Sequence, residues 1–227
     1  MTYIIAGKKQ NSTFMMADTI VTNVETKQKT IVNKMIKLES SKSTYYTFTG
    51  VQFIDNCVRT YDFWLSNTKR ESDFISGVNS IKELQSVIKR MIDTFSGREQ
   101  MTLEINRLFF INKNNVIYYD LAFDSNNELL KDAEKNILND NEFIDSSVLT
   151  GIKEGIPEMD IQDFCKIYLA YLSKKNVDFK DRYSFVELFA DGKETFNEPF
   201  KNFSDLIALY NNVDFSELDN PDFTWNI

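Results

Sequence analysis

The chain of 227 residues contains no histidine. This absence excludes the Ser-His-Asp and Cys-His forms of nucleophilic catalysis and every metal site that depends on histidine ligands. The two cysteines, Cys57 and Cys165, lie far apart in segments with helical patterns. Two separated cysteines cannot form a thiolate zinc site, so we expect buried free thiols, no metal ion and no cofactor. A hydrolase of this composition must take its base from a lysine, a carboxylate or an α-amine.

An excess of positive charge is also absent, since the formal net charge is -8. Binding to a phosphate backbone requires clustered Lys and Arg, so nucleic acids and anionic membrane surfaces are poor partners. No apolar run approaches the roughly 18 residues of a spanning helix, and the N-terminus lacks the pattern of a signal peptide. We therefore expect a cytoplasmic protein.

The residues that are present describe a globular chain. The hydrophobic fraction is 42% and the charged fraction 26%, which is enough apolar surface for a substantial core. We expect one domain over residues 1–227, with a short helix and an acidic tail in 203–227.

The apolar patterns predict strands, two helices, strands, two more helices and a closing hairpin. The expected strands are 3–8, 12–18, 30–38, 44–48, 102–112, 116–123, 184–190 and 193–196. The expected helices are 51–67, one that begins at a capping box of Ser80 and Glu83, a short one near 147–154, and one from the N-cap Asp160 to about Ser173. The polar stretch 124–142 predicts an exposed loop. This order favours an α+β fold, a four-layer αββα sandwich of two antiparallel sheets.

Two of the expected strands carry a charge on an apolar face. Asp18 shares a face with Phe14 and Met16, and Lys34 shares one with Val32 and with Ile36 and Leu38. Because a lone buried charge costs several kcal/mol, the two residues are predicted to form a buried ion pair. The alternative places both at strand ends, with Asp18 starting a turn and Lys34 reaching solvent.

The position of these charges relative to the chain start resembles a known family. Thr2 becomes the first residue if Met1 is removed, and Asp18 and Lys34 follow it at separations of 16 and 32. Proteasome β subunits and their bacterial homologues, which are N-terminal nucleophile (Ntn) hydrolases, carry a catalytic threonine, an aspartate and a lysine at these separations. The chain is similar to that family at this point.

Further segments resemble the same family in order along the chain. FMMADTIVTN is similar to its segment around the aspartate, KMIKL to its lysine strand, and YYTFTG to the strand that ends at its oxyanion glycine, here Gly50. GIKEG and PEMDIQDFCKIYLAYL resemble its third and fourth helices. KDRYS places Asp181 and Ser184 like its Asp-x-x-Ser.

The resemblance implies a threonine peptidase that needs no histidine. The hydroxyl of Thr2 would attack a peptide carbonyl while its own α-amine, with an ordinary pKa of about 8, accepts the proton. Lys34 would lower the pKa of the nucleophile as a cation, and Asp18 would hold that lysine. The N–H of Gly50 would stabilise the oxyanion.

The resemblance also assigns supporting roles. Asp181 and Ser184 would position the terminal amine, and Ser146 would take the role of a serine before the third helix. Thr22 and Gly50 would align the backbone of the substrate.

The expected partners follow from the same resemblance. They are peptides or unfolded proteins as substrates, further copies of the chain in a homo-oligomeric ring, and an ATP-dependent unfoldase. Trp64 and Met91 are candidate contacts on helix faces.

Some residues depart from the pattern of the family. Ile20 stands where the family has an arginine, and Val51, Phe185 and Val186 stand where it has glycines. These departures keep open a catalytically inactive ring or scaffold subunit as the main alternative. An amide hydrolase that acts on a small molecule is a third reading.

Overall fold

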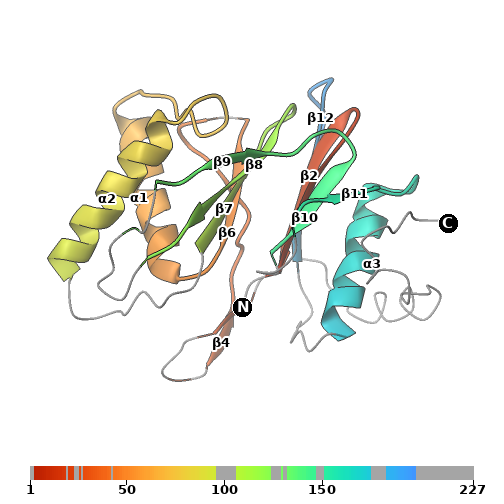
Figure 1. Cartoon of the computed structure of the whole chain (residues 1–227), viewed down its shortest axis with the longest axis horizontal. Coiled ribbons are helices and arrows are strands. Elements are labelled where there is room, and N and C mark those ends of the chain that lie inside the picture. Colours follow the sequence, from red (N-terminus) through yellow and green to blue (C-terminus); the bar gives the residue numbers. More distant parts are fainter. Residues whose placement is uncertain are drawn as a thin grey trace. The chain divides into compact units, whose positions relative to one another are not determined.

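The computed structural model describes residues 3–18, 20–22, 26, 28–41, 43–95, 106–123, 129, 132–146, 151–174 and 183–197. The chain divides into two compact units (Figure 1). The first consists mainly of Ile36–Ile137, and the second combines Thr2–Met35 with Leu138–Ile227. None of the described helices is long and apolar enough to cross a membrane.

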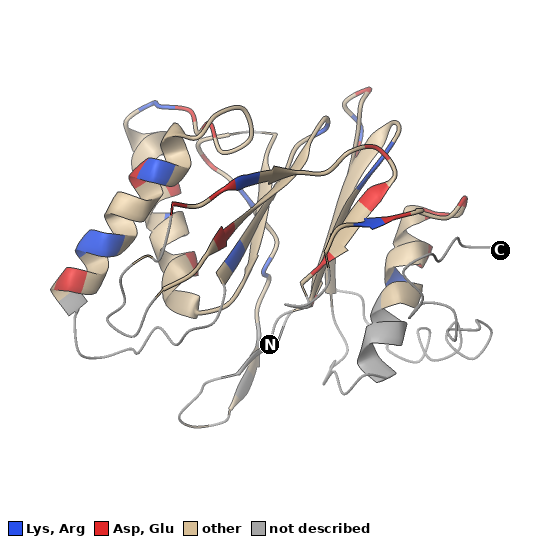
Figure 2. Ribbon diagram, viewed as in Figure 1, with Lys and Arg blue, Asp and Glu red and all other residues tan. Residues whose placement is uncertain are grey.

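The first unit is an antiparallel sheet with two helices against one face (Figure 1). Its strands, in spatial order, are β5 (Ile36–Lys37), β6 (Tyr45–Thr49), β7 (Asn106–Ile111), β8 (Val116–Leu121) and β9 (Lys135–Ile137). The helices are α1 (Gln52–Asn67) and α2 (Asn79–Phe95). Residues of both signs occur along α2 (Figure 2), as is typical of a helix with one solvated face.

The core of the first unit forms because its helices and its strands each have one apolar face, and these faces pack together. Ile54, Val58, Tyr61 and Leu65 recur at helical spacing on α1, and all are buried. They pack with alternate residues of the sheet in one continuous cluster that includes Phe110. This burial fixes both helices on that face of the sheet.

The second unit contains the chain start. Its main sheet has six strands in the order β11 (Lys153–Glu154), β10 (Glu142–Asp145), β1 (Ile4–Lys9), β2 (Ser12–Asp18), β12 (Tyr183–Phe189) and β13 (Glu194–Asn197). A separate pair is formed by β3 (Ile20–Thr22) and β4 (Lys29–Ile31). Helix α3 (Ile161–Lys174) packs on the main sheet, where the ring of Phe164 meets those of Phe14 and Phe143 edge to face.

Most of the expected elements are confirmed within a residue or two. The hairpin of β1 and β2 and that of β12 and β13 lie where the alternating patterns predict them. Asp160 is the N-cap of α3, since its Oδ1 accepts the N–H of Asp163 at 3.0 Å.

The prediction of one strand over 30–38 is wrong. Strand β4 ends at Ile31 and β5 begins at Ile36, with no strand between them. Val32 is 37% exposed, so it does not share a buried face with Lys34. The N–H of Met35 donates to the side chain of Asn33 at 3.0 Å, which replaces a ladder hydrogen bond with a local turn.

The predictions for 124–142 and 147–154 are wrong where the structure describes them. Lys135–Ile137 pairs with β8, Glu142 begins β10 beside β1, and Lys153–Glu154 is an edge strand rather than helix. All three strands are short, β9 and β11 are polar, and their pairing with neighbouring strands is a tertiary effect that composition does not reveal. Residues 102–105 of the expected strand 102–112, and residues 147–150 and 203–227, lie outside the described part of the chain.

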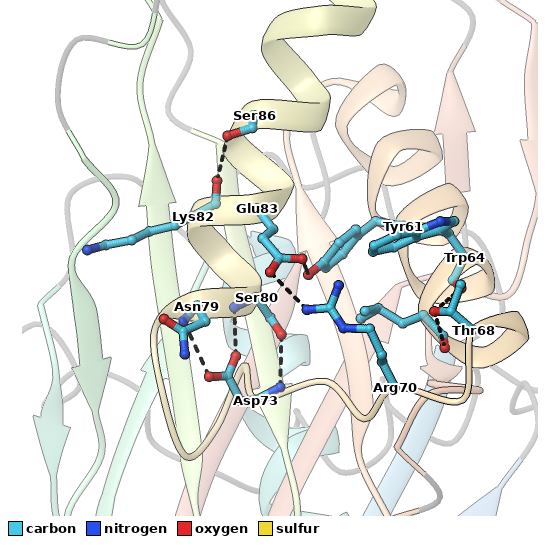
Figure 3. Close-up of polar contacts among 11 residues, drawn as sticks. Tyr61, Trp64, Thr68, Arg70, Asp73, Asn79, Ser80, Lys82, Glu83 and Ser86 are labelled. Carbon is cyan, nitrogen blue, oxygen red and sulfur yellow. Dashed lines mark hydrogen bonds and ion pairs between the residues drawn. The ribbon is translucent and has the colours of Figure 1, made fainter.

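The predicted capping box is also wrong (Figure 3). The N–H of Ser80 donates to Asp73 Oδ1 at 2.6 Å, and Ser80 Oγ accepts the N–H of Asp73 at 2.9 Å. Glu83 instead accepts hydrogen bonds from the hydroxyl of Tyr61 and from Arg70, both at 2.9 Å. The cap of α2 therefore comes from the preceding loop, outside the four-residue window that the motif reads.

Candidate active site

The main sheet of the second unit brings several predicted site residues into one row. Ile4 on β1 lies opposite Ala17 on β2, and Ala17 lies opposite Ser184 on β12. On the other side, Ser146 Oγ accepts the N–H of Ile4 at 2.9 Å and the N–H of Ser146 donates to the carbonyl of Ile4 at 2.9 Å. Ser146 thus lies directly beside β1, the strand that follows Thr2, and Ser184 lies on the other side of β1 with β2 between them. Thr2 itself is outside the described residues.

The start of β1 is tied to Asp18 by two hydrogen bonds. The N–H of Asp18 donates to the carbonyl of Tyr3 at 2.9 Å, and the N–H of Tyr3 donates to Asp18 Oδ1 at 2.9 Å. Asp18 is only 3% exposed. Its carboxylate therefore holds the residue that comes directly after the predicted nucleophile.

Lys34 forms the predicted buried ion pair with Asp18. Its Nζ lies 2.9 Å from Oδ1 and 3.0 Å from Oδ2 of Asp18, and the lysine is 2% exposed. The alternative in which Lys34 reaches solvent is therefore wrong. Removal of one partner from such a pair leaves an uncompensated charge and costs about 3–5 kcal/mol.

Burial changes the acidity of Lys34. Desolvation disfavours the ammonium form and lowers the pKa of Lys34 below its usual value, while the carboxylate of Asp18 acts in the opposite direction and offsets part of the effect. A lysine of this kind can serve as a fixed cation in a site closed to bulk water.

Asn33 joins this site although its sequence pattern did not indicate a role. Its Oδ1 accepts the hydroxyl proton of Ser184 at 2.8 Å and the N–H of Met35 at 3.0 Å. Ser184 is fully buried. The segment that presents Lys34 is thereby fastened to β12, through a contact between residues 151 positions apart.

A second polar group that the sequence did not indicate lies next to Ser146. The hydroxyl of Tyr168 on α3 donates to Asp145 Oδ2 at 2.6 Å, and Lys153 Nζ lies 3.7 Å from the same oxygen. Asp145 is fully buried. This carboxylate links β10 to α3 and β11, and so fixes the strand that carries Ser146.

Gly50 belongs to the first unit, at the end of β6. Its φ is +119°, in the region that favours glycine, and a Cβ at this position would lie 2.1 Å from Asn106 Oδ1. The same oxygen accepts the N–H of Val51 at 2.7 Å. Only glycine fits this turn, which Asn106 holds in place.

The remaining predicted site residues are only partly described. Thr22 lies in β3 opposite Lys29, and its side chain is not described. Asp181 lies outside the described residues. The roles predicted for Thr2, Asp18, Lys34, Gly50, Ser146, Asp181 and Ser184 in catalysis, and for Thr22 in substrate binding, stay predictions.

Neither cysteine has the chemistry of a nucleophile. Cys57 and Cys165 are free and buried, as expected. Burial raises the pKa of the Cys57 thiol to about 12 and that of Cys165 well above its usual value. Within the described ranges, no group of three or more Asp, Glu, Cys or His residues could hold a metal ion.

Two antiparallel sheets, one with α1 and α2 against it and the other with α3, define the class of the fold as α+β. The chain is similar to solved structures of Anbu, an ancestral beta-subunit. The Yersinia bercovieri protein matches with a TM-score of 0.60 and 9% identity over 92% of each chain. A Gly-1 mutant of Anbu from Hyphomicrobium sp. strain MC1 matches with a TM-score of 0.64 and 10% identity over 93% of each chain. The expected α+β fold of two antiparallel sheets is confirmed, and the chain shares the fold of these Anbu structures.

These comparisons correct the family suggested by the sequence. The similar structures are Anbu proteins, which are proteasome-like but distinct, so the assignment to proteasome β subunits and their bacterial homologues is wrong. The separations between Thr2, Asp18 and Lys34 follow from strand and turn lengths, which proteins of one fold share, so they cannot separate related families. No protein-family model matches the chain, and no curated protein matches it by sequence.

Proposed function

We propose that this chain is a cytoplasmic threonine peptidase subunit of a proteasome-like, self-compartmentalising protease. It hydrolyses peptide bonds through Thr2 after removal of Met1. One observation carries the proposal. Lys34 and Asp18 form a buried ion pair, and the same carboxylate accepts the backbone N–H of Tyr3, which follows Thr2. A buried ion pair is often no more stable than apolar side chains of similar volume, and groups with a perturbed pKa cluster at functional sites, so an ion pair attached to the start of β1 supports a catalytic role.

The chemistry proceeds in two steps at the N-terminus. The hydroxyl of Thr2 attacks the carbonyl carbon of the substrate, and the free α-amine accepts the hydroxyl proton, directly or through a water, and passes it to the leaving amine. An ester between Thr2 and the acyl half of the substrate results. Water then attacks this ester, gives its proton to the same α-amine, and releases the acid and the hydroxyl of Thr2.

The surrounding residues act on the charges that develop in these steps. Lys34, held by Asp18, stabilises the alkoxide character of the attacking oxygen as a cation. The N–H of Gly50 donates to the oxyanion. Asp181 and Ser184 orient the amine.

Ser146 and Thr22 have supporting roles in the proposal and do not act on the reacting groups directly. Ser146 holds the start of β1 through its bonds to Ile4. Thr22 aligns the backbone of an extended substrate.

The chain acts, in this proposal, as one domain over residues 1–227 within a homo-oligomeric ring that receives unfolded protein, with an unfoldase as partner. Exposed aromatic side chains on α1 support a contact there, since Phe63 and Trp64 are 61% and 46% exposed. The guanidinium of Arg70 lies 5.1 Å from the centre of the Trp64 ring and helps to hold it (Figure 3). Met91 is a poorer candidate than expected, because it packs against the core of the first unit.

The pH dependence of peptide hydrolysis tests the proposal. We expect kcat/KM to be bell-shaped. Activity is lost on the acid side as the α-amine, with an ordinary pKa of about 8, becomes protonated. It is lost on the alkaline side as Lys34 loses its proton, at a pH below the ordinary lysine value of about 10.4 because burial lowers this pKa. The profile is measured with fluorogenic peptides on protein whose Met1 has been removed.

A variant of a second, exposed lysine serves as the control for the alkaline limb of the pH profile. Replacement of the exposed Lys193 by Met should leave that limb unchanged, since Lys193 belongs to the β12–β13 hairpin turn. An alkaline limb that persists unchanged in Lys34→Met would contradict the role given to Lys34.

The alternative is a catalytically inactive ring subunit. The observation that favours it is Ile20, which opens β3 where the resemblance would place an arginine. Absence of turnover across the whole pH range, from protein that begins at Thr2, would support this alternative.

A further inference from the structure

The side chain of Asn33 connects two residues of the proposed site. Asn33 comes directly before the buried Lys34, in the segment that forms neither β4 nor β5. Its Oδ1 lies 3.0 Å from the N of Met35 and 2.8 Å from Oγ of Ser184. One oxygen atom therefore accepts two hydrogen bonds, one from the lysine segment and one from β12.

These two bonds determine the direction of the Ser184 hydroxyl. A backbone N–H can only donate, so the atom of Asn33 that faces Met35 must be the amide oxygen rather than the amide nitrogen. An amide oxygen can only accept. Ser184 must therefore donate its single hydroxyl proton to Asn33, and toward any other group it has only lone pairs to offer.

The direction of the Ser184 hydroxyl matters because the proposed base is the α-amine of Thr2. The lone pair of the α-amine has to face the hydroxyl of Thr2, so a neighbouring hydroxyl that donated to this lone pair would compete with Thr2. A hydroxyl that can only accept binds an N–H of the amine instead and leaves the lone pair available.

We propose that Asn33 is a positioning residue of the active site. It holds the Ser184 proton, and it thereby makes Ser184 an obligate acceptor that orients the terminal amine. This inference rests on the proposed function, in which Ser184 lies beside the amine of Thr2. It adds a residue whose effect reaches the reaction only through Ser184.

A double-mutant cycle tests this proposal on the full chain that begins at Thr2. The measured quantity is the rate constant for covalent labelling by a peptide epoxyketone, as a function of pH. In Asn33→Ala we expect a loss of about tenfold, the effect of one misdirected hydrogen bond. The acid limb should move to lower pH, because a Ser184 hydroxyl that donates to the amine favours its neutral form.

The Ser184→Ala background separates this mechanism from a purely structural one. There, Asn33→Ala should cause no further loss, because the hydroxyl it controls is already gone. Asn33→Asp should recover most of the rate lost in Asn33→Ala, since a carboxylate oxygen accepts both hydrogen bonds.

A matched control exists in the other unit of the chain. Asn112 Oδ1 accepts the N–H groups of Asn114 and Asn115 at 3.0 and 2.9 Å in the β7–β8 turn. Asn112→Ala removes the same kind of turn bond and should leave labelling unchanged.

The outcomes are distinguishable. Equal losses from Asn33→Ala with and without Ser184 would overturn the inference and leave the proposed function intact, because Asn33 would then act through the Met35 turn alone. Absence of labelling in the unsubstituted protein that begins at Thr2 would overturn the proposed function, and this inference with it.

Discussion

Substitution of Thr2 by alanine is expected to lower peptide hydrolysis by about 10,000-fold or more, because a single residue supplies both the nucleophile and its activation. The change removes the hydroxyl but keeps the α-amine. It also keeps the backbone bonds between Tyr3 and Asp18, which do not involve the side chain of Thr2. The melting temperature should therefore change by no more than about 4 °C, or ~1 kcal/mol for a chain of this size.

Thr2→Ser is the matched variant, since it restores a hydroxyl at the same position. It should retain measurable hydrolysis and labelling by an epoxyketone. Full activity of Thr2→Ala would show that the nucleophile lies elsewhere, and it would refute the mechanism.

Substitution of Lys34 by methionine is expected to reduce both activity and stability. The side chain of methionine has a similar length but no charge, so the carboxylate of Asp18 would stay buried without its cation. We expect a loss of about 3–5 kcal/mol in the free energy of unfolding. We also expect kcat to fall roughly 100- to 1,000-fold, the usual effect of losing one electrostatic stabiliser. Urea unfolding and single-turnover kinetics measure the two effects separately.

The double variant Asp18→Asn with Lys34→Met separates stability from catalysis. It removes both charges of this pair, and the amide oxygen that replaces the carboxylate can still accept the N–H of Tyr3. Most of the lost stability should return, because neutral replacements of a buried pair are often tolerated. Activity should not return. Recovery of both together would mean that Lys34 has only a structural role.

The central part of the candidate site could be predicted from local sequence because it depends on β2 and on a segment that follows it closely in the chain. A charge on an apolar strand face needs a partner of opposite sign, and the separation of 16 positions between Asp18 and Lys34 is long enough for the chain to return beside β2. The pair therefore formed as expected, even though 30–38 is not one continuous strand. The free-energy cost of an unpaired buried charge was therefore a more reliable guide to the position of Lys34 than the apolar alternation that predicted a strand over 30–38.

The other parts of the site depend on contacts that a local pattern cannot reveal. Asn33 meets Ser184 across 151 positions, and Tyr168 meets Asp145 across 23. A single asparagine within TIVNKMIKL gives no sign of a partner so far along the chain. Only the fold shows that its oxygen also holds a buried hydroxyl.

The errors in the predicted elements have related causes. β9, β10 and β11 are short strands that pair with β8, β1 and β10 respectively, and local composition does not reveal these contacts. The cap of α2 comes from Asp73, seven residues before Ser80, so a four-residue motif misses it. The family assignment was wrong for a similar reason, since catalytic spacing reports the fold rather than the branch of proteins within it.

The most direct test of the central claim is the intact mass of the purified chain before and after reaction with a peptide epoxyketone. We expect a protein that has lost Met1 and gains one adduct, which tandem mass spectrometry places on Thr2. A chain that retains Met1 completely and gains no adduct would contradict the claim that Thr2 is the nucleophile.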